Sequence, residues 1–155
     1  MTKTALRLDN FIPYRLSFTS NLVSDAISSA YEALFGLKIP EWRLIAVIAE
    51  NAGVTQQEIG ARTRMEKITV SRAAIALADR GLIERAPSTA DRRARSLRLT
   101  AQGRKLYASV APKALELEAK IFGAFTPEEL VTFVSMLRRI DAITLAAGIG
   151  TDAEA

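Results

Sequence analysis

The chain contains neither cysteine nor histidine among its 155 residues, and these two absences exclude several classes of function. Without cysteine it has no disulfide framework and no thiol redox sensor, and without histidine as well it lacks the usual ligand sets for zinc, copper and haem. Nucleophile–histidine pairs are also excluded, so only carboxylate, lysine or tyrosine mechanisms remain open to an enzyme. We therefore expect no metal site, no cofactor and no catalytic site.

Long hydrophobic segments are absent too. No apolar run approaches the roughly 20 residues that a membrane-spanning helix needs, and the first ten residues, MTKTALRLDN, contain no hydrophobic signal-peptide region. These features predict a cytoplasmic protein with no membrane partner. With 49% hydrophobic residues and a mean hydropathy of +0.12, the composition nevertheless favours apolar surface beyond a single core, and hence association of subunits.

The positive charge is concentrated in the middle of the chain. Residues 58–105 contain twelve lysines or arginines against five acidic residues, a net charge of +7, whereas the rest of the chain carries −3. A basic segment between ends of lower charge is typical of proteins that bind a polyanion, because lysine and arginine neutralise phosphates and release their counterions. A merely solvated charged surface is the simpler alternative.

Apolar residues at helical spacing predict the elements on either side of this basic segment. Residues 11–35 have the pattern of one long helix with Gly36 at its end, and a second helix begins at Pro40. Beyond residue 100, one helix contains Pro112 as an expected kink or break, and another opens with the capping box of Thr126-Pro127-Glu128-Glu129. The apolar residues of this last helix cover more than one face, which predicts packing against a partner subunit.

The basic segment itself has the pattern of a helix-turn-helix followed by a hairpin. Thr55-Gln56-Gln57-Glu58 matches a capping box that opens a short helix, and a second helix spans residues 66–80. Residues 82–85 and 96–99 are short strand candidates. The segment between these strands is basic and has almost nothing apolar to bury, so we interpret it as the exposed tip of a hairpin wing.

The 66–80 helix is the candidate reader of DNA bases, because a helix fits the major groove and each base pair there has a distinguishable pattern. Its N-terminal half contains four side chains that can reach base edges or phosphates: Lys67, Thr69, Ser71 and Arg72. The planar guanidinium of Arg72 suits a bidentate contact to guanine, and a simple phosphate contact is an equally good interpretation.

The wing carries Arg92, Arg93 and Arg95, which suit the negative potential of the minor groove. Asp91 lies beside them, and an acid that faces DNA is unfavourable. We therefore expect Asp91 to accept hydrogen bonds from wing amides or from a neighbouring arginine, and so to organise the wing rather than contact DNA.

At these residues the chain resembles the MarR family of transcriptional regulators, from about Leu8 to Ala146. The segments that carry the resemblance are Pro40-Glu41-Trp42-Arg43, Lys67-Ile68-Thr69-Val70-Ser71-Arg72, Arg80-Gly81-Leu82-Ile83-Glu84-Arg85, Asp91-Arg92-Arg93, and Leu97-Arg98-Leu99-Thr100 with Gly103. The resemblance implies a homodimer joined by its first and last helices that binds a palindromic operator. It also implies that Arg93 enters the minor groove and that Asp91 organises the wing.

Members of this family commonly repress transcription and are released by a small aromatic or acyl ligand. Tyr14, Arg15, Trp42 and Arg43 are the candidate pocket residues, although residues of these types near helix starts are more often core or surface. The segment Phe11-Ile12-Pro13-Tyr14-Arg15-Leu16 is similar to members that answer to aromatic-acid CoA thioesters, so an aromatic acid or an aromatic acyl-CoA is the expected effector.

These observations predict a mainly α fold with a small β-hairpin wing. We expect an N-terminal dimerisation helix in residues 1–36, a winged helix-turn-helix lobe in 37–100, C-terminal dimerisation helices in 101–147 and a frayed tail in 148–155. An architectural DNA-binding protein without an effector is the main alternative. Two more distant alternatives are a helical module that binds an acidic protein and an enzyme.

Overall fold

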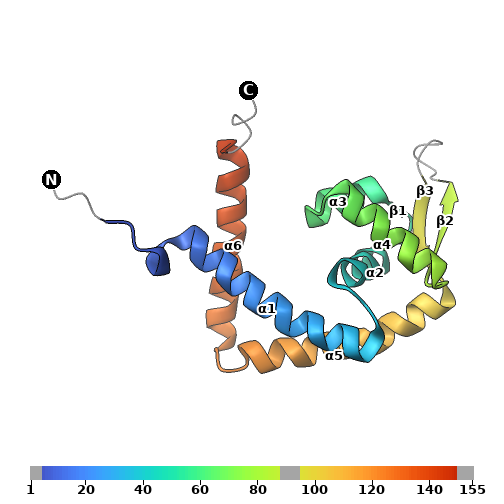
Figure 1. Ribbon diagram of the computed structural model, residues 1–155, viewed down its shortest axis with the longest axis horizontal. Coiled ribbons are helices and arrows are strands. Elements are labelled where there is room, and N and C mark those ends of the chain that lie inside the picture. Colours follow the sequence, from blue (N-terminus) through green and yellow to red (C-terminus); the bar gives the residue numbers. More distant parts are fainter. Residues whose placement is uncertain (1–4, 88–94, 150–155) are drawn as a thin grey trace. The chain divides into compact units, whose positions relative to one another are not determined.

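The computed structural model describes residues 5–87 and 95–149 of the chain (Figure 1). The chain divides into two compact units, residues 1–115 and 116–155. Within the described ranges, no helix is long and apolar enough to cross a membrane.

The first unit begins with the 3-10 helix η1 (Leu8–Asn10) and the long helix α1 (Ile12–Phe35). Pro13 lies in the first turn of α1, where its missing N–H leaves no helical hydrogen bond unmade. Gly36 ends the helix in the left-handed conformation, with φ +61°, and its N–H donates to the Glu32 carbonyl at 3.0 Å. The predicted helix of residues 11–35 is therefore confirmed.

Three shorter helices follow: α2 (Ile39–Glu50), α3 (Gln56–Thr63) and α4 (Lys67–Asp79). Thr55 caps α3 through its side-chain oxygen, which accepts from the Glu58 N–H at 3.2 Å. The predicted helix-turn-helix is thus present, with α4 one residue shorter at each end than predicted.

The small sheet has the strand order β1-β3-β2 and is antiparallel throughout. The strands β2 (Ile83–Pro87) and β3 (Arg95–Leu99) form the predicted hairpin, with Ile83 opposite Leu99. The two-residue strand β1 (Val54–Thr55) pairs with β3 and is an addition to the prediction.

Asp91, Arg92 and Arg93, predicted at the wing tip, lie outside the described residues.

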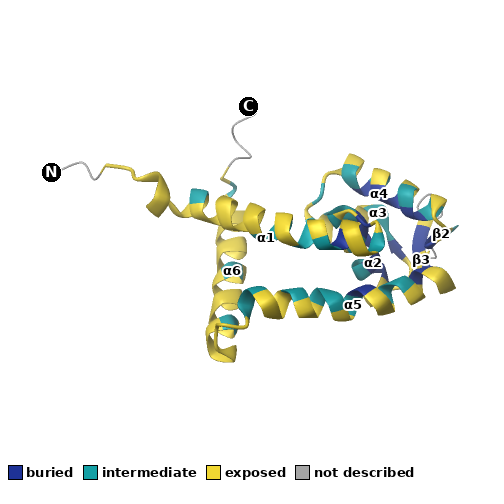
Figure 2. Ribbon diagram, turned by 60° about the horizontal axis from the view of Figure 1, so that its bottom comes forward, coloured by how far each residue is buried: buried dark blue, intermediate teal, exposed yellow. Residues whose placement is uncertain are grey.

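The core of the first unit lies where α2, α3, α4 and the sheet meet, as the dark blue segments of Figure 2 show. Its fully buried side chains are Leu37, Leu44, Ile45, Ile48, Ile59, Val70, Leu77, Leu97 and Val110. Each such aliphatic side chain contributes about 1.5–3 kcal/mol by leaving water. This core holds α4 in place through one face and leaves its other face to solvent.

The junction between the sheet and α5 (Ala101–Phe122) is closely packed around Gly103. A Cβ atom at this position would overlap the carbonyl of Leu82 and press on the Cβ of Leu99. Thr100 fixes the same junction: its hydroxyl donates to the Gly81 carbonyl at 2.6 Å and accepts from the Gly103 N–H at 3.0 Å. Thr100 therefore connects the end of α4 to the start of α5.

Of the kink or break predicted at Pro112, the break is wrong, because α5 runs without interruption through that proline, and the kink stays a prediction. A proline removes one hydrogen bond and crowds one carbonyl, and the remaining bonds of the 22-residue helix keep it continuous.

The second unit is the end of α5 and α6 (Pro127–Ala147). The predicted capping box is confirmed: the Thr126 N–H donates to Glu129 Oε1 at 3.0 Å, and the Glu129 N–H donates to Thr126 Oγ1 at 3.1 Å. Helix α6 contains no buried residue, and Figure 2 shows it exposed along nearly all its length. Its exposed apolar side chains are Val131, Phe133, Val134, Met136, Ile140, Ile143 and Leu145.

Candidate nucleic-acid interface

The turn between α3 and α4 is short and internally bonded. The Thr63 hydroxyl donates to the Ile59 carbonyl at 2.7 Å and accepts from the Met65 N–H at 3.3 Å. Arg64 follows Thr63 in the left-handed conformation, with φ +56°. It is the one residue other than glycine with a positive φ among the described residues. This turn sets the angle at which α4 leaves α3.

Helix α4 has one buried and one exposed face. Val70, Ala73, Ala74 and Leu77 are buried, as the helical spacing predicts. Of the four predicted reading residues, Lys67 and Arg72 are exposed, whereas Thr69 and Ser71 are half-buried. The two cations therefore present the accessible positive charge of this helix, and the two hydroxyl groups lie nearer its packed side.

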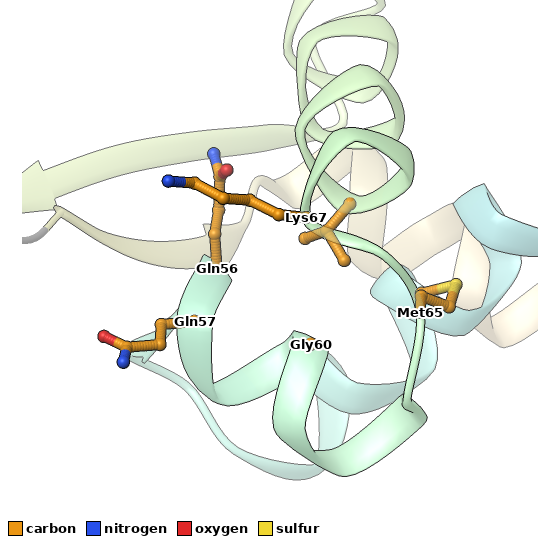
Figure 3. A pocket seen from close by; sticks show the side chains of 6 residues that line it. Gln56, Gln57, Gly60, Met65 and Lys67 are labelled. Atoms are coloured by element: carbon orange, nitrogen blue, oxygen red, sulfur yellow. The ribbon is translucent and has the colours of Figure 1, made fainter. Parts of the chain in front are cut away.

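A hollow of about 430 Å³ lies between α3 and the start of α4 (Figure 3). Gln56, Gln57 and Gly60 border it from α3, and Lys67 and Val70 border it from α4, with Met65 in the turn between them. Two amides and one ammonium group thus surround a shallow surface beside the N-terminal half of α4, where the predicted reading residues lie. Such groups can donate hydrogen bonds to phosphate oxygens.

A second hollow, of about 270 Å³, connects the start of α3 to the wing strands. It is lined by Thr55, Gln56, Gln57, Arg85 and Arg95. Arg85 and Arg95 are exposed and stand on β2 and β3 respectively. Arg95, a predicted wing residue, therefore lies near the helix-turn-helix.

Gln56, Gln57 and Arg85, which line these hollows, and the exposed Arg64 of the turn were not among the predicted contact residues and are further candidates. The signal for the two glutamines was available, because they follow the Thr55 cap and so occupy the first turn of α3. Arg85 could have been found from the register of the hairpin, since its partner Leu97 lies two residues from Arg95. Nothing local indicated Arg64, whose backbone conformation is usual for glycine and asparagine.

Three of the four predicted effector residues, Tyr14, Arg15 and Trp42, belong to two aromatic clusters of the first unit. Near the start of α1, the rings of Tyr14 and Phe18 lie 6.0 Å apart, and the Arg15 guanidinium carbon lies 5.3 Å from the centre of the Phe18 ring. Trp42 belongs to the other cluster. Its ring stacks on the ring of Tyr107, with the ring centres 5.8 Å apart, and meets the Tyr31 ring edge-on, with the ring centres 5.7 Å apart. Arg43 is exposed.

Tyr31 is the buried member of the second cluster, with 3% of its surface exposed. Burial raises the pKa of its phenol above the ordinary value of 10.0, because the charged phenolate loses its hydration. The ring is therefore a neutral packing group at physiological pH.

Tyr107 also lines a hollow of about 350 Å³ on the first unit, together with Ile48, Ala49, Ala52, Arg98, Leu99 and Arg104. The Arg104 Nη1 atom donates to the Leu99 carbonyl at 3.1 Å, which fixes this guanidinium at the rim. The hollow combines an aromatic ring, aliphatic walls and two cations. Sequence reasoning missed it because its residues come from α2 and the turn after it, from β3 and from α5, which are distant along the chain.

No group of three or more acidic side chains within the described ranges is arranged to hold a metal ion, and the chain has no histidine or cysteine to supply other ligands.

Comparison with known proteins assigns the fold. Residues 35–94 match the family model described as MarR family. The chain is 28% identical over 101 residues to the transcriptional regulator HosA of Escherichia coli O157:H7, covering 65% of this chain and 75% of HosA.

Two solved structures extend the similarity over most of the chain. The first, a MarR family transcriptional regulator from Silicibacter pomeroyi DSS, is 31% identical, with a TM-score of 0.76 and coverage of 86% of this chain and 89% of that one. The second, CouR from Rhodococcus jostii RHA1 bound to p-coumaroyl-CoA, is 22% identical, with a TM-score of 0.79 and coverage of 88% and 96%. The latter identity supports the fold alone. The predicted winged helix-turn-helix fold is confirmed.

Proposed function

The chain belongs to the MarR family of transcriptional regulators, and from this premise we propose that it is a ligand-responsive homodimeric repressor of a palindromic operator. The observation that carries the DNA-binding part is the arrangement of α4. Its inner face is buried in the core, and its outer face presents Lys67 and Arg72 to solvent next to the wing strands.

In this proposal the first half of α4 enters the major groove. Arg72 contacts guanine or a phosphate, and Lys67 contacts the backbone together with Gln56 and Gln57 at the start of α3. Thr69 and Ser71 are half-buried and short, so they reach only groups that come close to the helix. The wing enters the adjacent minor groove through Arg92, Arg93 and Arg95, and Asp91 holds the wing in shape.

The dimer in this proposal forms through the terminal helices. Apolar side chains are exposed on α1 and on α6, with Leu22 at 62% and Val131 at 71% exposed, and a helix with so much uncovered apolar surface requires a partner. A second copy of the chain is the occupant that a palindromic operator requires, because operator symmetry mirrors protein symmetry. Sedimentation at micromolar concentration tests this proposal, and a stable monomer would refute it.

We propose an aromatic acid or its CoA thioester as the effector that releases the DNA. CouR, a protein of the same fold, is bound to p-coumaroyl-CoA in its structure. In this chain, the candidate residues Tyr14, Arg15, Trp42 and Arg43 combine rings with cations. Tyr107 joins Trp42 to the hollow that holds Arg98 and Arg104. An aromatic anion needs both a ring to stack on and a positive partner.

The DNA-binding proposal is tested by selecting operator sequences with the full-length chain and then measuring affinity against salt concentration. A steep fall of log K with log salt is expected, because each neutralised phosphate releases counterions. Arg72→Ala and Arg93→Ala are each expected to weaken binding about 10-fold or more, which corresponds to the removal of one interaction worth roughly 1–3 kcal/mol. Ile75→Ala, at the far end of the exposed face of α4, is the control and should bind as the wild type does.

The effector proposal is tested on the same operator with a panel of aromatic acids and their CoA esters. Release by one or more of these compounds supports it. If no compound weakens binding, the protein is better described by the alternative, an architectural DNA-binding protein without an effector.

A further inference from the structure

Two isoleucines on α4 stay outside the core. Ile68 has 53% and Ile75 has 50% of its surface exposed, whereas the apolar residues of the inner face, Val70, Ala73, Ala74 and Leu77, are buried. The two lie seven residues apart with Arg72 between them, a spacing that places all three on one face of the helix. This face is the one that the packed core leaves to solvent.

An exposed isoleucine is not by itself evidence of a contact, because single apolar residues are common on protein surfaces. The two positions differ in their surroundings. Ile68 lies in the first turn of α4, directly after Lys67 and one turn before Arg72, so it is bordered by two exposed cations. Ile75 lies between Arg72 one turn earlier and Asp79 one turn later, about 10 Å farther along the axis than Ile68, at 1.5 Å of rise per residue.

The charges indicate which of the two comes close to DNA. Phosphates attract Lys67 and Arg72 on both sides of Ile68, whereas Ile75 has a cation on one side only and the acidic Asp79, which phosphates repel, on the other. In a helix-turn-helix, the N-terminal residues of the second helix contact base edges. With α4 bound in this way, Ile68 would be the exposed apolar side chain of the helix that comes nearest the bases.

An isoleucine side chain neither donates nor accepts hydrogen bonds, so it can recognise only an apolar feature of the bases. The C5-methyl group of thymine is the one apolar group that the bases present in the major groove. We propose that Ile68 packs against a thymine methyl group in each half-site of the operator and so makes this position specific for a T·A pair. The proposal rests on the proposed function, since it requires that α4 bind in the major groove.

The test replaces thymine by deoxyuridine, which removes the methyl group and leaves the base pair intact. Each thymine of the selected operator is replaced in turn, in one half-site or in both, and affinity is measured for the wild type, Ile68→Ala, Ile68→Val and Ile75→Ala. Burial of one methyl group is worth about 0.8 kcal/mol, so the wild type should lose affinity about fourfold per half-site and about 15-fold for both at one symmetric position. Ile68→Val, which keeps branched methyl groups, should retain part of this discrimination.

Ile68→Ala should bind operators with thymidine or deoxyuridine at that position equally well, whereas Ile75→Ala should discriminate between them as the wild type does. Both variants alter exposed side chains, and their thermal unfolding should match that of the wild type. If no thymine is sensitive to loss of its methyl group, or if Ile68→Ala retains the discrimination, the inference is wrong and the proposed function stands. If the chain selects no duplex sequence at all, the proposed function fails and the inference fails with it.

Discussion

The guanidinium of Arg80 holds the end of α1 through the carbonyl of Gly36, to which its Nη1 atom donates at 3.1 Å. Its Nη2 atom donates to the neighbouring carbonyl of Phe35 at 3.2 Å. These carbonyls lie at the C-terminal end of a helix, where acceptors have no partners within the helix and carry partial negative charge. Arg80 is the C-cap residue of α4. One side chain therefore connects α4, the proposed reading helix, to α1, the long helix that we propose for the dimer.

Arg80→Gln should lower the free energy of unfolding by about 1 kcal/mol, because the substitution removes two charge-assisted hydrogen bonds at an exposed site. Arg80→Lys should recover less than half of the lost free energy of unfolding, since one ammonium group cannot bond two carbonyls as well as the planar guanidinium of arginine does. Urea denaturation measures the stability of both variants. The protein concentration is kept fixed, because the stability of a dimer depends on concentration. Arg72→Ala, which alters an exposed arginine of the same helix, is the control and should stay within about 0.5 kcal/mol of the wild type. Equal destabilisation by all three variants would contradict this assignment.

Gly103→Ala should destabilise the protein by about 1–3 kcal/mol, because the new methyl group overlaps the Leu82 carbonyl and the strand must shift to make room. Gly60→Ala provides the matched control. Its added Cβ would lie 3.7 Å from the Met65 carbonyl oxygen, an ordinary contact, and alanine favours the helical conformation by about 0.5–1 kcal/mol. The two substitutions should therefore have opposite signs in thermal unfolding. A neutral Gly103→Ala variant would show that the junction between β2 and α5 is looser than its geometry indicates.

Arg64→Gly should stabilise the fold by up to about 1 kcal/mol, because a side chain in the left-handed conformation is strained and glycine is not. Asparagine tolerates this conformation, so the stability of Arg64→Asn should lie between those of the wild type and Arg64→Gly. If the positive charge of Arg64 also neutralises a phosphate, both variants should bind operator DNA more weakly, and the slope of log K against log salt should become shallower by about one unit. A gain of stability together with unchanged DNA affinity would limit the role of Arg64 to the turn.

Local signals account for the parts of the fold that were predicted correctly. Caps and glycines define the helix ends, as at Thr55, Thr126 and Gly36, because each of these residues acts on its own neighbours. The buried face of α4 follows from spacing alone. The strand β1 was missed because two residues carry no periodicity, and its pairing with β3 depends on a segment more than 40 residues away.

The candidate site was only partly predictable for the same reason. Lys67 and Arg72 could be assigned from their place on one helix, but the half-buried state of Thr69 and Ser71 depends on how other elements pack around that helix. The stacking of Trp42 on Tyr107 joins residues of α2 and α5, and the hollow beside it needs β3 as well. Contacts between distant segments leave no local pattern in the sequence. Pro112 is the opposite case, in which a local signal allowed a break and the rest of a long helix keeps the element continuous.

The buried phenol of Tyr31 predicts how stability depends on alkaline pH. Its pKa in the folded protein is raised above the value of 10.0 expected for the unfolded chain. Below pH 10 the phenol is protonated in both states and contributes no pH dependence. As the pH rises through 10 the unfolded state loses its proton first, so unfolding becomes more favourable and stability falls until the folded-state pKa is passed.

Tyr31→Phe removes this phenol, and the stability of the variant should decline less steeply than that of the wild type above pH 10. Denaturation midpoints measured in pairs at pH 7 and at a series of values above pH 10 separate the alkaline slope from any constant cost of the substitution. Parallel curves for the two proteins would show that the Tyr31 phenol ionises as readily in the folded state as in the unfolded chain.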